Sequence, residues 1–92
     1  MVRVFVLYEQ EPDEERYERH VELCRRVLNA VFRHGKVTRT LFGNALAYVA
    51  EWEFADADVF KAAAATDEFR ATGADAAEMG VPHSVYVADL DG

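Results

Sequence analysis

The spacing of apolar residues along the chain predicts alternating strands and helices. Residues 2–8 read Val-Arg-Val-Phe-Val-Leu-Tyr, a run rich in β-branched and aromatic side chains that ends at a polar cluster, which favours a strand. Alternation places Phe5 and Leu7 on one face and the valines with Tyr8 on the other. Because a strand that is apolar on both faces is typical of a layered interior, we predict that this strand is central in its sheet.

A first helix is predicted to begin near Pro12 and to close at Gly35, which serves as a left-handed cap. Acidic residues at its start suit the positive end of the helix dipole, and Arg33 and His34 fall in the predicted last turn. Apolar residues recur at helical spacing over about five turns. This stripe consists of Tyr17, Val21, Cys24, Leu28 and Val31.

A β-hairpin is predicted after this helix. Residues 36–42 and 45–54 are β-like, and Gly43-Asn44 between them is a two-residue turn signal. The second strand of the hairpin alternates and therefore has one apolar face. That face consists of Leu46, Tyr48, Ala50, Trp52 and Phe54.

A second helical region is predicted to follow the hairpin. Asp56 is its expected N-cap, and Thr66 restarts the helix as a further capping residue. The region is predicted to continue in short helical pieces broken at Gly73 and to stop at Gly80.

Pro82 opens a last strand over residues 83–88, and a proline there is tolerated on an edge strand. The order β-α-β-β-α-β predicts an α+β, ferredoxin-like split βαβ fold in a single domain of residues 1–92. Such a fold has a four-stranded antiparallel sheet with two helices on one face. Its other face would be apolar and bare, and a twofold dimer that packs sheet on sheet covers such a face. We therefore expect a homodimer.

Composition and charge narrow the possible partners. The 92 residues are 51% hydrophobic, enough for one folded domain with a thin core. Ten Lys and Arg against 17 Asp and Glu give a net charge of −7, the wrong sign for nucleic acid or an anionic membrane surface. The single cysteine excludes an intramolecular disulfide, and the N-terminal run lacks the features of a signal peptide. We expect a soluble, cytoplasmic protein.

Four segments carry a family resemblance: residues 4–8, 12–17, 50–56 and 79–81. Through them the chain resembles the EthD-type proteins of the dimeric α+β barrel superfamily, over nearly its whole length. The resemblance implies a homodimer whose sheets close into a barrel, with a small apolar pocket in each subunit between sheet and helices. The wider superfamily includes monooxygenases of polyketide aromatics, muconolactone isomerases and haem-binding members, and many EthD-type proteins have no assigned chemistry.

Two histidines are candidate acids or bases. His20 lies at the edge of the helical stripe, where it either exchanges a proton in a pocket or is a boundary residue bonded to a neighbour. His34 either caps the first helix or faces the pocket. His20 and Cys24 have the spacing of a zinc half-site, but without a second pair no metal site is predicted. No cofactor is predicted, and haem stays open with His20 or His34 as axial ligand.

Seven residues are candidate ligand contacts. Glu51 and Glu53 share a strand face, where they either serve acid and base chemistry or, as we favour, pair with Arg3 or Arg39. Aromatic side chains with a polar tip suit a ligand cavity as well as a core. The predicted ligand-binding residues are Tyr8, Tyr48, Glu51, Trp52, Phe60, Met79 and Tyr86.

The function expected from these features is the binding of a small hydrophobic or aromatic molecule. If the protein is an enzyme, the resemblance implies cofactor-independent oxygenase or isomerase chemistry. The alternative is a non-catalytic binding or structural module. The sequence shows no phosphate-cradling glycine loop or nucleophile elbow, which argues against phosphoryl transfer, nucleotide redox chemistry and serine hydrolysis.

Overall fold

β1 (Val2–Tyr8) is the central strand of an antiparallel sheet in the computed structural model, which describes residues 1–91. β3 (Tyr48–Phe54) and β4 (His83–Asp89) pair with its two edges, and β2 (Val31–Lys36) pairs with the far edge of β3. The four strands therefore have the order β2-β3-β1-β4. The predicted central position of the first strand and edge position of the last strand are confirmed.

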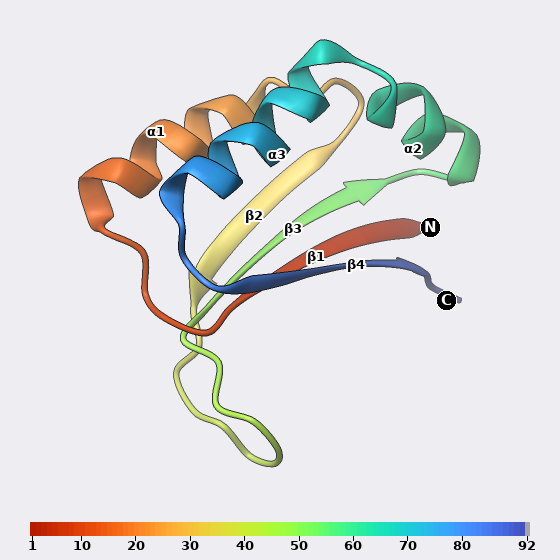
Figure 1. Cartoon of the computed structure of the whole chain (residues 1–92). Helices are drawn as coiled ribbons and strands as arrows, with labels where there is room; N and C mark the ends of the chain where they lie inside the picture. The colour runs from red at the N-terminus through yellow and green to blue at the C-terminus, as the bar shows by residue number, and fades with distance from the viewer. Residues whose placement is uncertain (92) are drawn as a thin grey trace.

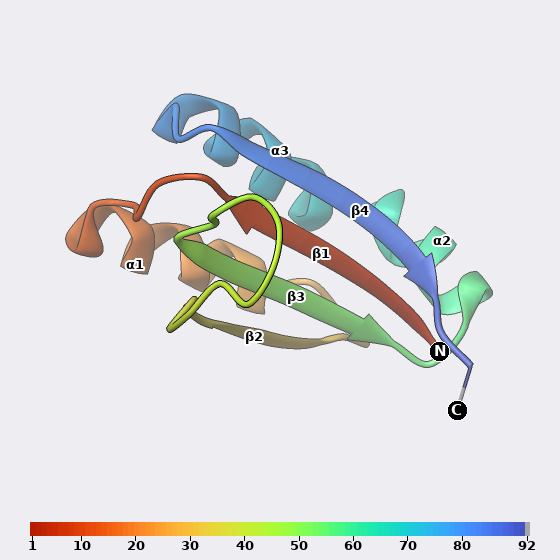
Figure 2. The same ribbon diagram turned by 90° about the horizontal axis from the view of Figure 1, so that it is seen from below.

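Three helices cover one face of this sheet and leave the other face open, as Figures 1 and 2 show. α1 (Glu14–Arg25) follows β1, whereas α2 (Ala57–Ala64) and α3 (Asp67–Met79) both lie between β3 and β4 in the chain. The predicted β-α-β-β-α-β plan is confirmed, with its second helical region divided into two helices.

Capping residues set the bounds of α2 and α3 as predicted. The Asp56 carboxylate and the Thr66 hydroxyl each accept a hydrogen bond from the backbone N–H three residues on, at 2.9 and 3.2 Å. Gly80 ends α3 with a φ of +71°, a left-handed conformation that favours glycine. The predicted break at Gly73 is wrong, because α3 runs through it and one interior glycine costs only about 1 kcal/mol.

The predicted end of the first helix is also wrong. α1 ends at Arg25, and Asn29 reverses the chain with a φ of +58° before β2 begins at Val31. The residues that continued the apolar stripe, Leu28 and Val31, are 66% and 49% exposed. The helical spacing there is accidental, because residues 31–36 gain the backbone pairing of an edge strand along β3.

The predicted hairpin is right only in its second strand, whose residues 48–54 form β3. The predicted first strand, residues 36–42, is wrong, because β2 spans Val31–Lys36 and the loop of residues 37–47 takes the place of both that strand and the Gly43-Asn44 turn. The backbone N–H of Val37 donates to the carbonyl of Ala47 at 3.0 Å and closes the base of this loop. Beyond it the loop projects past the end of the sheet (Figure 1).

The core lies between the helices and the sheet. Trp52 of β3 pairs with Val4 of β1 and donates its indole N–H to the carbonyl of Cys24 in α1 at 3.0 Å, which ties the sheet to the helix. Within residues 1–91, none of the helices combines the length and apolar character that a bilayer-spanning segment needs. The largest fully buried side chains are those of Tyr8, Phe54, Val4 and Cys24.

Candidate functional site

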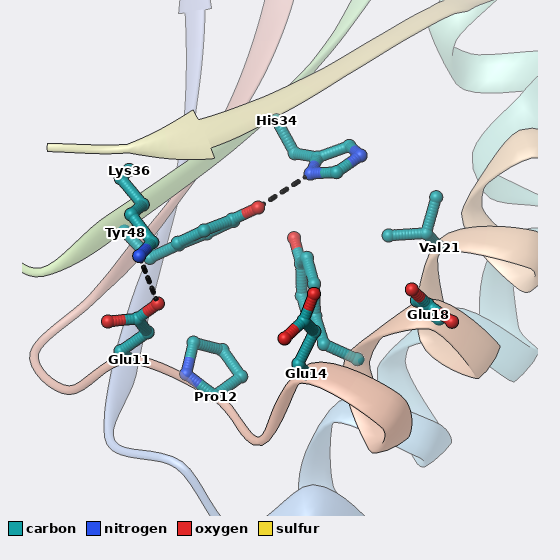
Figure 3. Close-up of a pocket in the computed structure, with 9 residues that line it drawn as sticks. Glu11, Pro12, Glu14, Glu18, Val21, His34, Lys36 and Tyr48 are labelled. Carbon is teal, nitrogen blue, oxygen red and sulfur yellow. Dashed lines mark hydrogen bonds and ion pairs between the residues drawn. The ribbon is translucent and has the colours of Figure 1, made fainter.

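A cavity of about 430 Å³ lies between the first half of α1 and the adjoining ends of β2 and β3 (Figure 3). Its walls are aromatic and aliphatic, and its remaining lining is charged. Because its lining comes from residues 11–21 and from two strands, it forms only when α1 packs on the sheet. The lining residues are Glu11, Pro12, Glu14, Tyr17, Glu18, Val21, His34, Lys36 and Tyr48.

His34 and Tyr48 form a hydrogen-bonded pair on the strand side of this cavity. The His34 Nδ1 lies 2.8 Å from the Tyr48 hydroxyl (Figure 3). Burial, with a smaller contribution from the charge of Arg25, lowers the pKa of His34, and burial raises the pKa of Tyr48. At neutral pH the pair therefore consists of a neutral imidazole and a protonated phenol. Within residues 1–91, the His34 Nε2 has no hydrogen-bond partner, so it remains free for a ligand.

Tyr17 supplies a second aromatic wall from α1. Its ring centroid lies 5.0 Å from that of Tyr48 and 5.6 Å from that of His34. Its hydroxyl is buried, and the Tyr8 hydroxyl is near enough to perturb the pKa of Tyr17, but the two do not meet in hydrogen-bonding geometry. Burial is the main cause that raises the pKa of Tyr17. Sequence analysis missed this residue, because its place on the apolar stripe of the helix indicated core packing.

Negative charge is in excess among the side chains that line the cavity. Lys36 Nζ lies 3.0 Å from a carboxylate oxygen of Glu11, and this hydrogen bond raises the pKa of Lys36. Glu14 and Glu18 also line the cavity, are exposed, and make no ion pair with any residue in the described range 1–91. The rim therefore carries two carboxylates beyond the balanced Lys36–Glu11 pair.

His20 lies outside the cavity, in the seam between α1 and α3. It is 4% exposed, and its Nδ1 lies 2.8 Å from a carboxylate oxygen of Asp75. Arg16 donates to both oxygens of the same carboxylate, at 2.7 and 3.1 Å. The hydrogen bonds from Arg16 are the main cause that lowers the pKa of Asp75. The structure thus places His20 in a clamp between two helices, and its predicted catalytic role stays a prediction.

Four of the predicted ligand contacts lie in the core. Tyr8 is 1% exposed behind the Tyr17 and Tyr48 rings, and Trp52 contacts Phe69 at a centroid distance of 5.4 Å. Phe60 and Met79 pack against the same core. Of the predicted site residues, the structure therefore brings only His34 and Tyr48 together at this cavity. Within the described part of the chain, no group of three or more His, Cys, Asp or Glu side chains could hold a metal ion.

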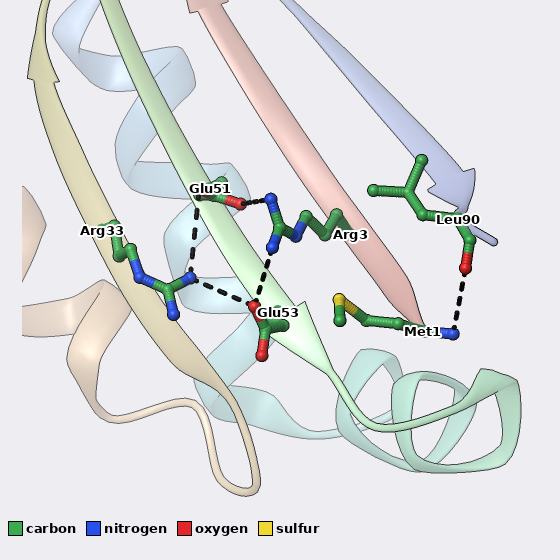
Figure 4. A network of polar contacts seen from close by, with 6 residues as sticks. All are labelled: Met1, Arg3, Arg33, Glu51, Glu53 and Leu90. Carbon is green, nitrogen blue, oxygen red and sulfur yellow. Dashed lines mark hydrogen bonds and ion pairs between the residues drawn. The ribbon is translucent and has the colours of Figure 1, made fainter. Parts of the chain in front are cut away.

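Two further predicted ligand contacts, Glu51 and Tyr86, lie on the open face of the sheet, opposite Phe5. Glu51 forms an ion pair with Arg3 at 3.3 Å and lies 3.9 Å from Arg33 (Figure 4). Glu53 also pairs with both arginines, at 3.0 and 3.3 Å. The predicted pairing with Arg3 is confirmed, and Arg33 takes the place predicted for Arg39. Because two arginines balance two carboxylates here, this network is typical of a structural contact.

Comparison of the sequence with protein-family models gives no match, and comparison with the curated proteins gives none either. Solved structures do match the fold. An ethyl tert-butyl ether D (EthD) family protein from Bacillus halodurans superposes with a TM-score of 0.80 at 21% identity, covering 99% of both chains. A dimeric ferredoxin-like protein of unknown function from Thermobifida fusca gives 0.68 at 16% identity, covering 97% of this chain and 90% of that one.

SnoaB, a cofactor-independent oxygenase from Streptomyces nogalater, gives a TM-score of 0.61 at 18% identity and covers 99% of this chain and 92% of that chain. Identities this low establish the fold and leave activity open. The chain has a ferredoxin-like fold, which it shares with an EthD family protein, as its sequence resemblance predicted.

Proposed function

We propose that this protein binds a small hydrophobic or aromatic molecule in the cavity between α1, β2 and β3. The observation that carries this proposal is the cavity itself, walled by Tyr17, Tyr48 and His34 and by the aliphatic Val21 and Pro12. Its volume of about 430 Å³ lies toward the lower end of the range of small-molecule sites, which suits a ligand of one or two rings.

A homodimer is the assembly that we propose. The open face of the sheet carries Phe5, Leu7 and Val49, all partly exposed, around the arginine–glutamate network. A second copy packed face to face removes these side chains from water. The solved structure from Thermobifida fusca is described as dimeric, which supports the same arrangement here. Native mass spectrometry should then give twice 10.4 kDa, which is 20.8 kDa.

The His34–Tyr48 pair is the acid–base element of this proposal. When the imidazole hydrogen is on Nδ1, Nδ1 donates to the Tyr48 oxygen and Nε2 is free to accept a proton from the ligand. The lowered pKa of His34 keeps the imidazole neutral at pH 7, which an accepting base requires. SnoaB, a cofactor-independent oxygenase, shares this fold, and a proton-accepting imidazole would suit chemistry of that kind.

Filling the cavity tests the proposal without altering its polar groups. In the Val21→Phe variant, a larger side chain occupies the cavity, and we expect binding of aromatic fragments to weaken at least tenfold. Leu23→Phe is the matched control, because Leu23 is also partly buried on α1 but lies on the side that faces Asp75. Amide chemical shifts in ¹⁵N-labelled protein report both affinity and location.

Shift changes should centre on the residues around His34 and Tyr48. Equal binding by wild type and Val21→Phe, or shift changes confined to the open face of the sheet, would contradict the proposed site. A Tyr86→Phe control should bind as wild type does, since Tyr86 lies on the open face.

A further inference from the structure

The unbalanced charge of the cavity rim restricts which molecules enter. Figure 3 shows Glu14 and Glu18 on the α1 side of the cavity, across from His34 and Tyr48 on the strands. Lys36 is held by Glu11 at 3.0 Å, so its charge is already compensated. The charge of Arg25 also lowers the pKa of His34, but Arg25 does not line the cavity and donates to the carbonyl of Phe32.

The walls of the cavity are suited to positive charge for a second, independent reason. The Tyr17 and Tyr48 rings meet at 74° with their centroids 5.0 Å apart, and the His34 ring stacks on Tyr48 at 6.0 Å. An aromatic ring attracts a cation that lies over its face, within about 6 Å of the ring centroid. Among residues 1–91, the buried Tyr17 hydroxyl makes no hydrogen bond, although the Tyr8 hydroxyl is close enough to affect its pKa, and the Tyr17 oxygen can accept from an N–H group.

We propose that the cavity selects a small aromatic amine in its protonated form, with the ammonium group between the Glu14 and Glu18 carboxylates and the faces of Tyr17 and Tyr48. This inference rests on the proposed function and specifies its ligand class. Carboxylated or phosphorylated ligands are disfavoured, because the rim would bring like charges together. The selected group needs no counter-ion from Lys36, which remains bonded to Glu11.

Three probes of nearly equal shape distinguish the effect of ligand charge on affinity from the effect of ligand shape. Tyramine carries an ammonium group at pH 7, tyrosol carries a neutral hydroxyl in its place, and 4-hydroxyphenylacetate carries a carboxylate. In calorimetric titrations at low ionic strength, we expect tyramine to bind about tenfold more tightly than tyrosol, with the acid the weakest of the three. Raising the salt to about 0.5 M should shrink this preference, because exposed charges are screened.

The double variant Glu14→Gln/Glu18→Gln should reduce the preference for tyramine over tyrosol to about twofold or less. Glu15→Gln is the matched control, since Glu15 stands in the same first turn of α1, is exposed and does not line the cavity. This control should retain the wild-type preference.

The outcomes distinguish the two proposals. Tyrosol binding as tightly as tyramine to the wild type, or an unchanged preference in the double variant, would overturn the charge selection and leave the cavity as a binding site. Failure of all three probes and of the aromatic fragments to bind would overturn both.

Discussion

The Asp75 carboxylate joins α3 to α1 through several hydrogen bonds, and the variant Asp75→Asn tests how much these bonds stabilise the fold. Asp75 lies on α3 and accepts three hydrogen bonds from α1, two from Arg16 and one at the His20 ring. The side chains of Asp75, Arg16 and His20 are 16%, 24% and 5% exposed. The asparagine keeps the shape of the side chain but removes its charge and one acceptor oxygen.

The expected loss follows from these bonds. A hydrogen bond to a charged group contributes about 1.5–3 kcal/mol, and removing one member of a largely buried network leaves the other members without a partner. Because Asp75 and Arg16 retain some contact with water and the asparagine still accepts one bond, we expect the free energy of unfolding to fall by about 2–4 kcal/mol. For a domain of this size that corresponds to a fall in Tm of about 10 °C or more.

Urea unfolding followed by the fluorescence of Trp52, the only tryptophan, measures this loss. Both proteins are compared at two concentrations, since association would add to the apparent stability. Glu78→Gln is the matched control, because Glu78 is an exposed carboxylate three residues further along α3 with no ion pair in the described range, and it should change stability by about 0.5 kcal/mol or less. A loss below about 1 kcal/mol in Asp75→Asn, or an equal loss in Glu78→Gln, would refute this reasoning.

The pH dependence of the stability difference between wild type and Asp75→Asn provides a second test of the same contact. The pKa of Asp75 is lowered in the folded protein, chiefly by the hydrogen bonds from Arg16. Its contribution is therefore fully present above the ordinary pKa of 3.8 and is lost as the pH falls through the lowered folded value. The stability difference between wild type and Asp75→Asn should be constant near neutral pH and shrink in acid. A difference that grows as the pH falls below 4 would contradict the assignment.

Three further outcomes follow from single contacts. Burial raises the pKa of Cys24 to about 12, so the thiol of the native protein should resist a thiol reagent at pH 8 and react once urea unfolds the chain. Fast labelling of the native protein would instead show that α1 opens. Gly80→Ala forces a Cβ into a φ of +71° and should cost about 1–2 kcal/mol in thermal unfolding, whereas Gly73→Ala, inside α3, should stabilise or be neutral. Trp52→Phe removes the 3.0 Å indole donor of the Cys24 carbonyl, which keeps the Val27 N–H at 3.4 Å. It should cost about 0.5–1.5 kcal/mol in urea unfolding followed by circular dichroism, and a neutral result would show that this bond adds nothing.

Local signals in the sequence determined most of the fold. The two-residue alternation in residues 2–8 is sufficient to predict a strand, and its apolar character on both faces placed it at the centre of the sheet. Asp56, Thr66 and Gly80 mark helix ends through bonds or dihedral angles that involve only the next few residues. Such features need no information from distant parts of the chain, which is why the order of elements was predictable.

The boundary between the first helix and β2 depended on tertiary contacts. Leu28 and Val31 continue the helical spacing, so a pattern of apolar residues could not indicate that the helix ends at Arg25. Phe32 decides the matter, since it is 8% exposed and packs on Trp52 at a centroid distance of 5.2 Å only when its segment is a strand beside β3. Trp52 is distant in sequence, and this pairing competes successfully with local helix propensity.

Two features of the tertiary structure formed the candidate site: the direction in which each side chain of α1 points, and the packing of α1 against β2 and β3. The sequence by itself supplied His34 and Tyr48 as candidates, and the structure joined them at 2.8 Å and added Tyr17 from α1. His20 follows Tyr17 by three residues, which at 3.6 residues per turn displaces it by about 60° around α1. That angle carries its side chain away from the cavity and into the α3 seam, where Asp75 binds it. Sequence spacing records the angle between two side chains, but only packing fixes which of them faces the sheet.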